Sequence, residues 1–474
     1  MSHLDDLRLA VGEPHVLTGI DAAPYLTDWR ERYSGRALAV VRPGSTDEVA
    51  AVVRACAAAG VPIVPQGGNT GLCGGATPDE SGHAVVLSLQ RLNRVRSIDP
   101  DNDTMVVEAG CVLQTVQEAA HGAGRLFPLS LGAEGSCTIG GNLSTNAGGT
   151  QVLRYGTMRE LTLGLEVVTA QGDVWHGLRG LRKDNTGYDL RDLFIGSEGT
   201  LGIITAATLK LYPLPVARCT ALLALASIED AIGMLSRARH DFGASLTGFE
   251  LMSGDCLASV VRCFPQQRLP FEGEAAALPW YALLELSDSE SETHARERFE
   301  TVLGEAIESG CVKDAVIAGS VAQSNALWHL RESIPLAEKA LGKAIKHDVS
   351  IPVSRMTDFV RDTNHALQQA FPGIRNVVFG HLGDGNLHYN VAPGEGWTDA
   401  SLLARQDDVF ALVHDSVHAV GGSISAEHGV GQLKRDALVR YKEPVELALM
   451  RSVKQALDPL GIMNPGKVLA VTSR

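Results

Sequence analysis

The chain has 474 residues, of which 45% are hydrophobic and 20% are charged, with 41 Lys and Arg against 55 Asp and Glu. The formal net charge of −14 excludes the basic surface typical of nucleic-acid-binding proteins, and the apolar content excludes disorder. The length predicts two or three domains, and the 50 glycines occur in clusters without a regular repeat.

The first predicted elements form a strand, a helix and a second strand. An apolar strand is predicted over Leu38–Val41, and Ser45 with Glu48 has the spacing of a capping box for a helix over Val49–Ala59. A strand over Val61–Val64 then leads directly into a glycine-rich segment. Further strands are predicted over residues 85–89, 95–98 and 104–108, a helix over 112–121, and a hairpin over 163–175.

Two prolines, at positions 213 and 215, mark a change in sequence texture. Beyond them, longer helical patterns alternate with short strands. We expect a lead-in over residues 1–35, a cofactor-binding domain over 36–215, a substrate or cap domain over 216–425, and a C-terminal segment over 426–474. We expect this last segment to complete the active site and to pack on the cofactor-binding domain.

Three glycine-rich segments, residues 65–71, 132–149 and 196–202, are candidate phosphate cradles. Glycine lets consecutive backbone N–H groups approach an anion, and the interleaved Ser, Thr and Asn residues add short donors. One such segment alone would more often be a tight turn, but three in one region favour a binding site for a pyrophosphate and the polar edge of a flavin. A Rossmann G-x-G-x-x-G is absent, and Gly461–Val468 lacks the Ser or Thr of a P-loop.

These segments resemble the FAD domain of the vanillyl-alcohol-oxidase/p-cresol-methylhydroxylase superfamily. The resemblance implies an α+β fold with two subdomains that hold FAD between them, followed by an α+β cap domain and a C-terminal helical segment. Some members attach the flavin to a histidine near the position of Asn69, so non-covalent FAD is expected here. The expected FAD-binding residues are Pro65, Gly67, Gly68, Asn69, Thr70, Gly71, Gly132, Gly135, Ser136, Thr138, Gly141, Asn142, Thr145, Asn146, Ala147, Glu198, Gly202, Ile203 and Asn464.

A second candidate site lies in the later half of the chain, where a strand, a Gly-Asp-Gly turn and a second strand span residues 377–391. His381 and His388 flank the turn, and a period of two places His388 on one strand face with Asn386 and Asn390. Residues 425–429 add the Glu427 carboxylate and a third imidazole, His428. Two imidazoles and a carboxylate suit Zn²⁺, and Mn²⁺ or Fe²⁺ also fit.

The motifs G-H-x-G-D-G-N-x-H from Gly380 and S-x-E-H-G-x-G from Ser425 are similar to those of the FAD-linked 2-hydroxy-acid dehydrogenases. The resemblance extends from about residue 36 to the closing residues 458–467. It implies that His381, His388 and Glu427 bind the metal, that His428 is the catalytic base and also contacts substrate, and that Asn390 contacts substrate.

Arg331 and Lys346 bear on the choice of hydroxy acid. Composition alone favours two surface charges in helices. The segment around Lys346, however, resembles the D-2-hydroxyglutarate dehydrogenase branch, in which an Arg and a Lys at these positions recognise a distal carboxylate. Pro335 stands where some members of the branch carry a substrate-contacting threonine, which leaves malate and hydroxyglutarate both open.

We therefore expect FAD-dependent, metal-assisted oxidation of a D-2-hydroxy dicarboxylate, D-2-hydroxyglutarate or D-malate, to its 2-oxo acid. The hydride would pass from Cα to the flavin, and the electrons would pass on to an electron-transfer flavoprotein or a quinone-type carrier. The alternatives are a D-lactate or glycolate dehydrogenase of the same group, a flavin-free metallohydrolase, and a non-catalytic binding subunit. Homodimers are common in the family.

The expected location of the protein rests on its first residues, its apolar runs and its cysteines. The first six residues are acidic and have no apolar stretch of the signal-peptide type, and the apolar runs are far shorter than the ~20 residues of a membrane span. The eight cysteines form no C-x-x-C pair, and most lie in apolar or glycine-rich surroundings typical of a reducing compartment. We expect a soluble cytoplasmic protein without a membrane span.

Overall fold

The computed structural model describes residues 2–471, and they divide into two compact units. The first unit contains the residues up to Gly148, residues Gly156–Leu214 and the C-terminal segment from Glu427 on. The second contains residues Gly149–Tyr155 and Pro215–Ala426. The short segment Gly149–Tyr155 thus groups with the second unit, although the residues on either side of it belong to the first.

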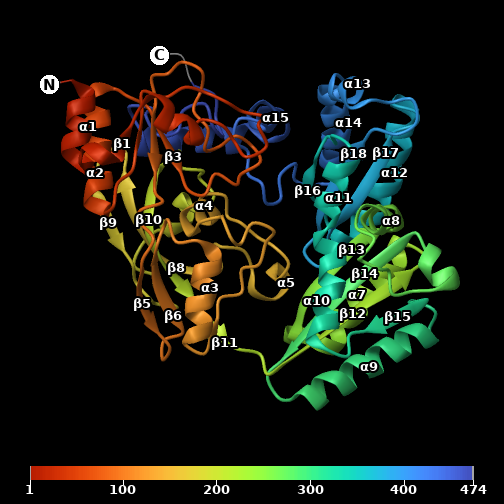
Figure 1. Ribbon diagram of the computed structural model, residues 1–474. Helices are drawn as coiled ribbons and strands as arrows, with labels where there is room; N and C mark the ends of the chain where they lie inside the picture. The colour runs from red at the N-terminus through yellow and green to blue at the C-terminus, as the bar shows by residue number, and fades with distance from the viewer. Residues whose placement is uncertain (1, 472–474) are drawn as a thin grey trace. The chain divides into compact units, whose positions relative to one another are not determined.

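The first unit contains a four-stranded sheet in the order β1-β2-β4-β3. Strands β2, β4 and β3 are parallel, because helix α2 connects β2 to β3 across one face, and β1 is antiparallel to β2. Helix α1 lies beside α2 (Figure 1) and buries Leu7 and Val11 in the same core. The N-terminal residues, for which the sequence predicted only a lead-in, therefore contribute to this core. The elements are α1 (His3–Val11), β1 (Val16–Leu17), β2 (Ala39–Val41), α2 (Thr46–Ala59), β3 (Ile63–Gln66), β4 (Val85–Ser88) and two 3₁₀ turns (Glu13–His15, Gly19–Tyr25).

Helix α2 begins and ends close to the predicted residues. The Ser45 hydroxyl accepts a hydrogen bond from the backbone N–H of Glu48 at 3.2 Å, as an N-cap does. The Glu48 carboxylate, however, accepts from the backbone N–H of Gly44 at 2.7 Å, so the predicted capping box is only half formed. The helix ends at Gly60, whose φ of +65° is the left-handed conformation that glycine adopts without strain.

The second sheet of the first unit has five strands in the order β5-β6-β10-β8-β9, all antiparallel to their neighbours. Its strands are β5 (Val95–Asp99), β6 (Thr104–Glu108), β8 (Thr162–Thr169), β9 (Val174–Gly177) and β10 (Gly202–Lys210). The other elements of the unit are α3 (Leu113–Gly122), β7 (Arg125–Leu126), α4 (Ile139–Ser144), α6 (Arg191–Phe194), β11 (Tyr212–Pro213), α15 (Arg435–Tyr441) and α16 (Pro444–Leu457). The predicted strands, helix and hairpin of this region are all present.

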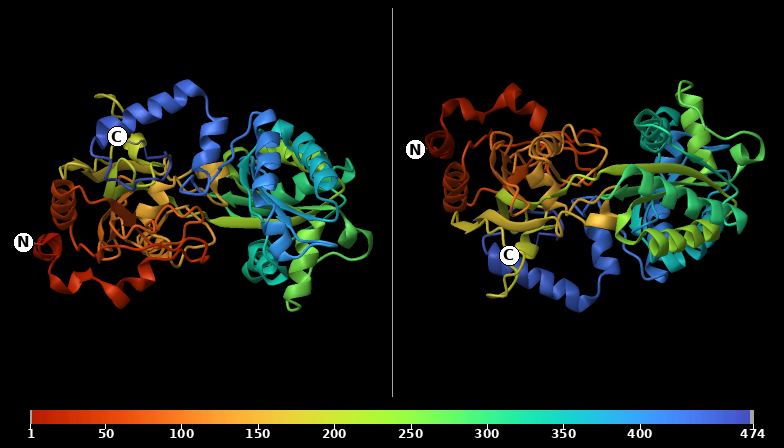
Figure 2. Two further views of the ribbon diagram at one scale, coloured as in Figure 1. Left: turned by 90° about the horizontal axis from the view of Figure 1, so that it is seen from above. Right: turned by 90° about the horizontal axis from the view of Figure 1, so that it is seen from below.

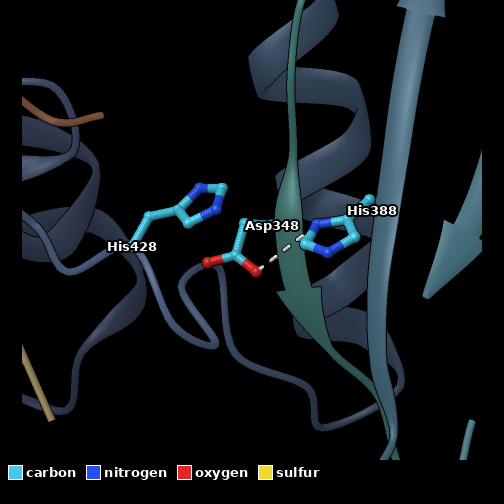
Figure 3. A group of neighbouring side chains, drawn as sticks. All are labelled: Asp348, His388 and His428. Atoms are coloured by element: carbon cyan, nitrogen blue, oxygen red, sulfur yellow. Dashed lines mark ion pairs between the residues drawn. The ribbon is translucent and has the colours of Figure 1, made fainter. Parts of the chain in front are cut away.

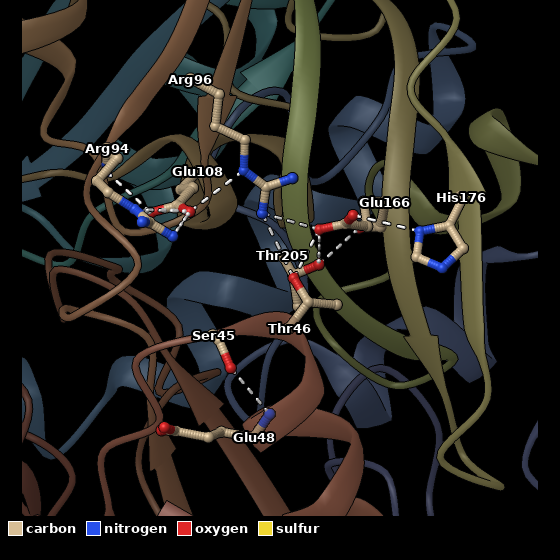
Figure 4. Close-up of polar contacts among 9 residues, drawn as sticks. All are labelled: Ser45, Thr46, Glu48, Arg94, Arg96, Glu108, Glu166, His176 and Thr205. Atoms are coloured by element: carbon tan, nitrogen blue, oxygen red, sulfur yellow. Dashed lines mark hydrogen bonds and ion pairs between the residues drawn. The ribbon is translucent and has the colours of Figure 1, made fainter.

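A buried polar network joins helix α2 to the five-stranded sheet (Figure 4). The Glu166 carboxylate accepts hydrogen bonds from Thr46 at 2.6 Å, Arg96 at 3.0 Å and Thr205 at 3.0 Å. Arg96 also donates to Glu108 at 3.2 Å, and Arg94 donates to Glu108 at 2.9 Å. Burial alone would raise the pKa of each carboxyl, but these hydrogen bonds and the arginine charges lower both overall.

The second unit is built on a seven-stranded antiparallel sheet in the order β15-β12-β14-β13-β17-β18-β16. Figure 2 shows helices on both sides of this sheet. Helices α7, α9, α12 and α14 cover the face that carries Leu223 and Phe249, and α8, α10 and α11 cover the face that carries Leu222 and Met252. Successive side chains along each strand thus alternate between two separate hydrophobic cores, one on each face of the sheet.

The strands of the second unit are β12 (Ala217–Leu225), β13 (Leu246–Ser253), β14 (Trp280–Asp288), β15 (Asp314–Ile317), β16 (Asp348–Ser350), β17 (Arg375–His381) and β18 (Asn386–Ala392). Its helices are α5 (Val152–Tyr155), α7 (Ile228–Phe242), α8 (Gly254–Cys263), α9 (Glu292–Glu308), α10 (Val321–Glu332), α11 (Ile334–Leu341), α12 (Met356–Ala370), α13 (Asp399–Leu403) and α14 (Gln406–Ala419), with 3₁₀ turns at Gly243–Ser245, Gly273–Ala277 and Val353–Arg355. Both units mix helices with mainly antiparallel sheets, as the predicted α+β class requires.

All eight cysteines are free thiols, six of them buried. Among the described residues, no helix combines the length and the apolar character that crossing a bilayer demands.

Candidate active site

The glycine-rich segments of the first unit meet around one pocket. The first segment enters it from the end of β3, the second from the start of α4, and the third from the turn before β10. The pocket is lined by Pro65, Gln66, Gly67, Gly68, Asn69, Thr70, Gly71, Cys73, Gly75, Ala76, Leu89, Thr138, Gly140, Gly141, Asn142, Ser144, Thr145, Glu198, Gly199 and His428. Eleven of the expected FAD-binding residues therefore share one cavity, and His428, expected as the catalytic base, lines it with them.

The backbones of the first two segments approach closely, and only glycine permits this. A Cβ on Gly68 would lie well inside the van der Waals radius of the Ser136 carbonyl oxygen, and one on Gly67 would collide with the Thr138 hydroxyl. Gly71 differs, because a Cβ there would meet no atom of the described residues within 4 Å. The first two glycines therefore shape the pocket wall, and the third leaves open space.

Four of the expected FAD-binding residues are held in the left-handed backbone region, which non-glycine residues rarely adopt. They are Asn69 (φ 54°), Asn146 (φ 51°), Glu198 (φ 52°) and Asn464 (φ 42°). Asn69 donates to the Thr27 carbonyl at 2.8 Å, and Asn464 donates to the carbonyls of Gly75 at 2.9 Å and Glu198 at 2.8 Å. These side chains tie the loops together, and strain of this kind concentrates at binding sites.

Glu198 fixes the segment that follows His428. Its carboxylate accepts hydrogen bonds from the backbone N–H groups of Val430 at 2.7 Å and Gly431 at 2.8 Å. Burial raises the pKa of Glu198, although both N–H donors act against that rise. Gly429 has a φ of +75°, and a Cβ there would collide with this carboxylate. Glu198 therefore anchors the loop that places His428 in the pocket lining.

The remaining expected FAD-binding residues do not line this pocket. Ser136 contributes a carbonyl oxygen to the wall behind Gly68, and Asn146 accepts from Thr157 and from the backbone of Arg159, each at 2.9 Å. Gly202 and Ile203 open strand β10. The other residues outside the lining are Gly132, Gly135, Ala147 and Asn464.

One buried polar group of the pocket indicates a polar ligand. The Thr138 hydroxyl is buried against it and has no hydrogen-bond partner among the described residues. A buried hydroxyl without a partner is costly, so a ligand atom at this position would satisfy it. Together with the glycine walls, this orphan hydroxyl suits the polar atoms of a dinucleotide.

The His381–His388 region belongs to the second unit and has the predicted hairpin form. His381 ends β17 and pairs directly with Asn386, which begins β18. Leu387 and Tyr389 are buried in the core on one sheet face, so Asn386, His388 and Asn390 share the opposite face. Gly385 turns the chain with a φ of +84°, and a Cβ there would collide with the Ile351 carbonyl.

A buried carboxylate accompanies each imidazole. The Nδ1 atom of His381 lies 2.7 Å from Oε1 of Glu250 on β13. The Nδ1 atom of His388 lies 3.9 Å from Oδ1 of Asp348 on β16, as the dashed line in Figure 3 shows. The two imidazole ring centroids are 5.7 Å apart. In each case the Nδ1 side of the ring faces a carboxylate, as it does in metal-binding histidines.

Acidic groups gather around these histidines. Burial raises the pKa of Asp384 to about 6, and the neighbouring Glu250 and Asp348 charges add to the rise. His381 opposes this rise. Imidazole with carboxylate is a usual donor set for Zn²⁺. The residues present in this unit therefore fit a divalent metal.

Glu427, the predicted carboxylate ligand, directly follows the last residue of the second unit, Ala426. The backbone N–H of Ala426 donates to the carbonyl of Asp348 at 3.2 Å, within the second unit. Glu427 and His428 come next and open the C-terminal part of the first unit. Asn390, expected to contact substrate, is buried, and its side-chain oxygen accepts from the His347 backbone at 3.0 Å.

The two predicted substrate cations are not ordinary surface charges. Arg331 is buried near the end of α10, and its Nε donates to Oε2 of Glu250 at 2.8 Å. Lys346 lies just before β16, and its Nζ is 2.6 Å from Oε2 of Glu338 on α11. Each cation therefore already has a carboxylate partner.

Three acids of this region were not found from the sequence, namely Glu250, Glu338 and Asp348. Glu250 and Asp348 stand in strands that are otherwise apolar or neutral, and a buried acid in such a strand almost always has a partner. An acid within an apolar strand could therefore have been recognised in the sequence, but the residue with which it pairs could not.

Comparison with known proteins agrees with this picture. A profile of the FAD binding domain matches residues 37–177, and one of the C-terminal domain of FAD linked oxidases matches residues 214–468. Among solved structures, p-cresol methylhydroxylase with substrate bound aligns with a TM-score of 0.76 at 18% identity over 99% of this chain and 96% of its own. The 4-ethylphenol oxidase of Gulosibacter chungangensis aligns with a TM-score of 0.73 at 19% identity, over 98% of this chain and 96% of its own. The fold is therefore the predicted p-cresol-methylhydroxylase type, and the profile matches assign the chain to the FAD-linked oxidases.

Sequence relatives narrow the class. The mitochondrial D-2-hydroxyglutarate dehydrogenase of Arabidopsis thaliana is 40% identical over 94% of this chain and 77% of its own length. The D-2-hydroxyglutarate dehydrogenase of Xanthomonas citri pv. viticola is 41% identical over 94% of this chain and 92% of its own length. That of Stutzerimonas stutzeri is 37% identical over 98% of this chain and 98% of its own length. The chain belongs to the D-2-hydroxyglutarate dehydrogenase family of FAD-linked oxidases.

Proposed function

We propose that this protein oxidises a D-2-hydroxy dicarboxylate, foremost D-2-hydroxyglutarate and second D-malate, to the 2-oxo acid, with FAD and a divalent metal, Zn²⁺ foremost. The observation that carries the proposal is the segment Ala426–His428. Ala426 is hydrogen-bonded to the strand that carries Asp348, and His428, two residues later, lines the flavin pocket. The expected carboxylate ligand and the expected base are thus neighbours in one short chain segment, which runs from the second unit into the first.

In this proposal His381, His388 and Glu427 hold the metal, and His428 is the base. When bound, the metal supplies Lewis acidity toward the substrate hydroxyl and 1-carboxylate, and FAD accepts the Cα hydride. His428 in its neutral form takes the hydroxyl proton, which balances the loss of hydride and proton from substrate. Glu198 supports this role, because it anchors the backbone two residues after His428.

The distal carboxylate would be recognised by Arg331 and Lys346, with Asn390 contacting substrate nearby. The Nε of Arg331 is occupied by Glu250, so the remaining edge of the guanidinium, formed by the two Nη groups, is the one that a carboxylate would engage bidentately. Among the described residues, no hydrogen bond from these Nη groups is formed. Lys346 would add a point charge from the loop before β16.

Asn69 supports non-covalent flavin, because the loop position has an amide engaged with Thr27 in place of a nucleophilic histidine. The reduced flavin would be reoxidised by a separate acceptor such as an electron-transfer flavoprotein or a quinone-type carrier. Mild denaturation followed by filtration should release all the flavin into the filtrate. Flavin that stays with the precipitated protein would contradict this part of the proposal.

A D-lactate or glycolate dehydrogenase of the same group is the second candidate. One observation favours it: the charges of Arg331 and Lys346 are each already balanced by a glutamate, which weakens the case for a dianionic substrate. A substrate panel separates the two candidates. The flavin-free hydrolase and the non-catalytic subunit have no support once the family is established.

Metal removal tests the metal assignment. Dialysis against a chelator should abolish turnover while the flavin absorbance stays with the protein, and Zn²⁺ or Mn²⁺ should restore turnover. His388→Ala should reproduce the chelated state and resist rescue. An enzyme that keeps full activity after its metal content has fallen to zero would end the metal part of the proposal.

A further inference from the structure

Glu250 contacts both His381 and Arg331, and neither contact was predicted from the sequence. It is the only acid in β13, and it is 1% exposed. Its two oxygens serve different partners: Oε1 meets Nδ1 of His381 at 2.7 Å, and Oε2 accepts from Nε of Arg331 at 2.8 Å. One carboxylate thus joins an expected metal ligand to an expected substrate cation.

The sheet register makes this bridge rigid. Glu250 and His381 are direct cross-strand partners on β13 and β17, so their side chains leave the same face of the sheet. Arg331 reaches the same face from the last turn of α10, and its guanidinium lies 4.9 Å from the ring centroid of Phe379. The Phe379 ring is in turn 4.9 Å from the His388 ring. All these groups belong to the second unit.

The two partners of Glu250 fix the hydrogen-bond roles at each end of the bridge. Nε of Arg331 can only donate, so Oε2 of Glu250 is the acceptor. A carboxylate oxygen accepts, so Nδ1 of His381 is the donor to Oε1 of Glu250, and a metal would meet this ring at Nε2.

We propose that Glu250 is a positioning residue that couples metal binding to recognition of the distal carboxylate. It holds His381 in the tautomer whose Nε2 can bind the metal, and it holds Arg331 by Nε so that the Nη edge is presented to substrate. This inference rests on the proposed function, because it takes His381 as a metal ligand and Arg331 as a substrate cation. Loss of the bridge would disturb both ends together.

Only a carboxylate can serve both partners. A glutamine at position 250 has one acceptor oxygen and one donor amide, so either His381 or Arg331 would face a donor. If the amide faces His381, the ring must move its proton to Nε2 and loses the lone pair for the metal. If the amide faces Arg331, the guanidinium must turn away. The charge lost in either case also leaves Arg331 buried without its counter-ion.

The chain offers a matched control in Glu285. This acid is buried on the neighbouring strand β14, and its carboxylate accepts from Nε1 of Trp328 at 2.8 Å. Trp328 lies on α10, the same helix as Arg331. Glu285→Gln therefore perturbs a buried acid that anchors the same helix, and its hydrogen-bond partners among residues 2–471 include no histidine.

The experiment compares Glu250→Gln with Glu285→Gln as flavin-loaded, metal-depleted full-length protein. Zn²⁺ affinity is measured by competition with a chromogenic chelator, and the ratio of kcat/KM for D-2-hydroxyglutarate to that for D-lactate is measured after Zn²⁺ is restored. We expect Glu250→Gln to weaken Zn²⁺ binding about 10–100-fold, as loss of a metal-ligand partner does, and to lower the ratio. We expect Glu285→Gln to change both by less than about threefold.

A double variant, Glu250→Gln with Arg331→Met, keeps the test valid where the single variant does not fold. With the guanidinium gone, the glutamine oxygen is free to face His381, so Zn²⁺ affinity should lie within about tenfold of the wild type while the preference for dicarboxylate stays lost. Equal Zn²⁺ affinity in wild type and Glu250→Gln, equal effects of Glu250→Gln and Glu285→Gln, or a double variant that binds no Zn²⁺ would each overturn the inference. A wild-type protein that binds neither Zn²⁺ nor Mn²⁺ would instead overturn the proposed metal site, and that result is visible before any variant is made.

Discussion

Nζ of Lys346 lies 2.6 Å from Oε2 of Glu338, whose side chain is 3% exposed. A cation expected to meet the distal carboxylate of a substrate therefore rests on a buried counter-charge. Substrate would compete with Glu338 for this ammonium, so the two residues should affect substrate binding in opposite directions.

Replacing Lys346 by Ala should raise KM for D-2-hydroxyglutarate about tenfold, or ~1.4 kcal/mol, because one charge contact to the distal carboxylate is lost. D-lactate has no such carboxylate, so its KM should change little. Steady-state kinetics with both substrates measures this. Equal losses on both substrates would mean that Lys346 serves only its contact with Glu338.

Replacing Glu338 by Gln should act in the other direction. Removing the competing charge leaves Lys346 more available, so KM for D-2-hydroxyglutarate should fall about threefold, or ~0.6 kcal/mol, the size of a partly exposed ion pair. The same kinetics on D-lactate is the control. An increase in KM for the dicarboxylate would show that Glu338 holds Lys346 in its working position and does not compete with substrate.

Replacing His428 by Ala should lower the rate of flavin reduction about 10²–10⁴-fold, the usual contribution of a general base. His428 is one of many residues lining the pocket, so the flavin should remain bound. Stopped-flow absorbance under anaerobic conditions follows the reduction, and the flavin-to-protein ratio controls for cofactor loss. Flavin reduction at the wild-type rate would remove His428 from the chemistry.

Two glycines of the first segment should respond differently to alanine. Gly68→Ala should abolish flavin retention, because the new Cβ would collide with the Ser136 carbonyl, a backbone atom that has little freedom to move. Gly71→Ala places its Cβ in open space and should retain flavin. The flavin absorbance of the two purified variants decides the matter. Similar flavin content in both would show that the pocket wall is not built as described.

The buried network around Glu108 and Glu166 should make the first unit sensitive to acid. Both pKa values are lower in the folded protein than the ordinary value near 4.5. The stabilisation from each carboxylate is therefore complete above about pH 5 and is lost as the pH falls through the lowered pKa values. Glu166→Gln should lower stability at pH 7.5 by about 1.5–3 kcal/mol and flatten the loss of stability on acidification. Denaturant unfolding at several pH values tests this, and an unchanged acid profile would contradict it.

Most of the secondary structure could be predicted from patterns of neighbouring residues. The hairpin around His381 and His388 followed from a period of two and a Gly-Asp-Gly turn, both of which depend on residues a few positions apart. The start of α2 followed from Ser45. The partner of Glu48 did not, because its carboxylate accepts from the backbone N–H of Gly44 and not from that of the N-cap residue.

The partners of the site side chains were beyond the sequence for a different reason. Glu250 and His381 are 131 positions apart and meet only because β13 and β17 pair in one particular register. A slip of one residue would place Glu250 on the opposite face of the sheet, toward a different core. Nothing local to either residue specifies that register, so the sequence predicted a metal-binding role for the histidines but could not predict the carboxylates behind them.

The central claim, oxidation of a D-2-hydroxy dicarboxylate through bound flavin, is tested most directly by anaerobic flavin reduction across a panel of D- and L-2-hydroxy acids. The account predicts that D-2-hydroxyglutarate bleaches the flavin absorbance fastest, that D-malate follows, and that D-lactate, glycolate and L-2-hydroxyglutarate are far slower. Fastest bleaching by D-lactate or glycolate, or no bleaching by either D-dicarboxylate, would contradict it.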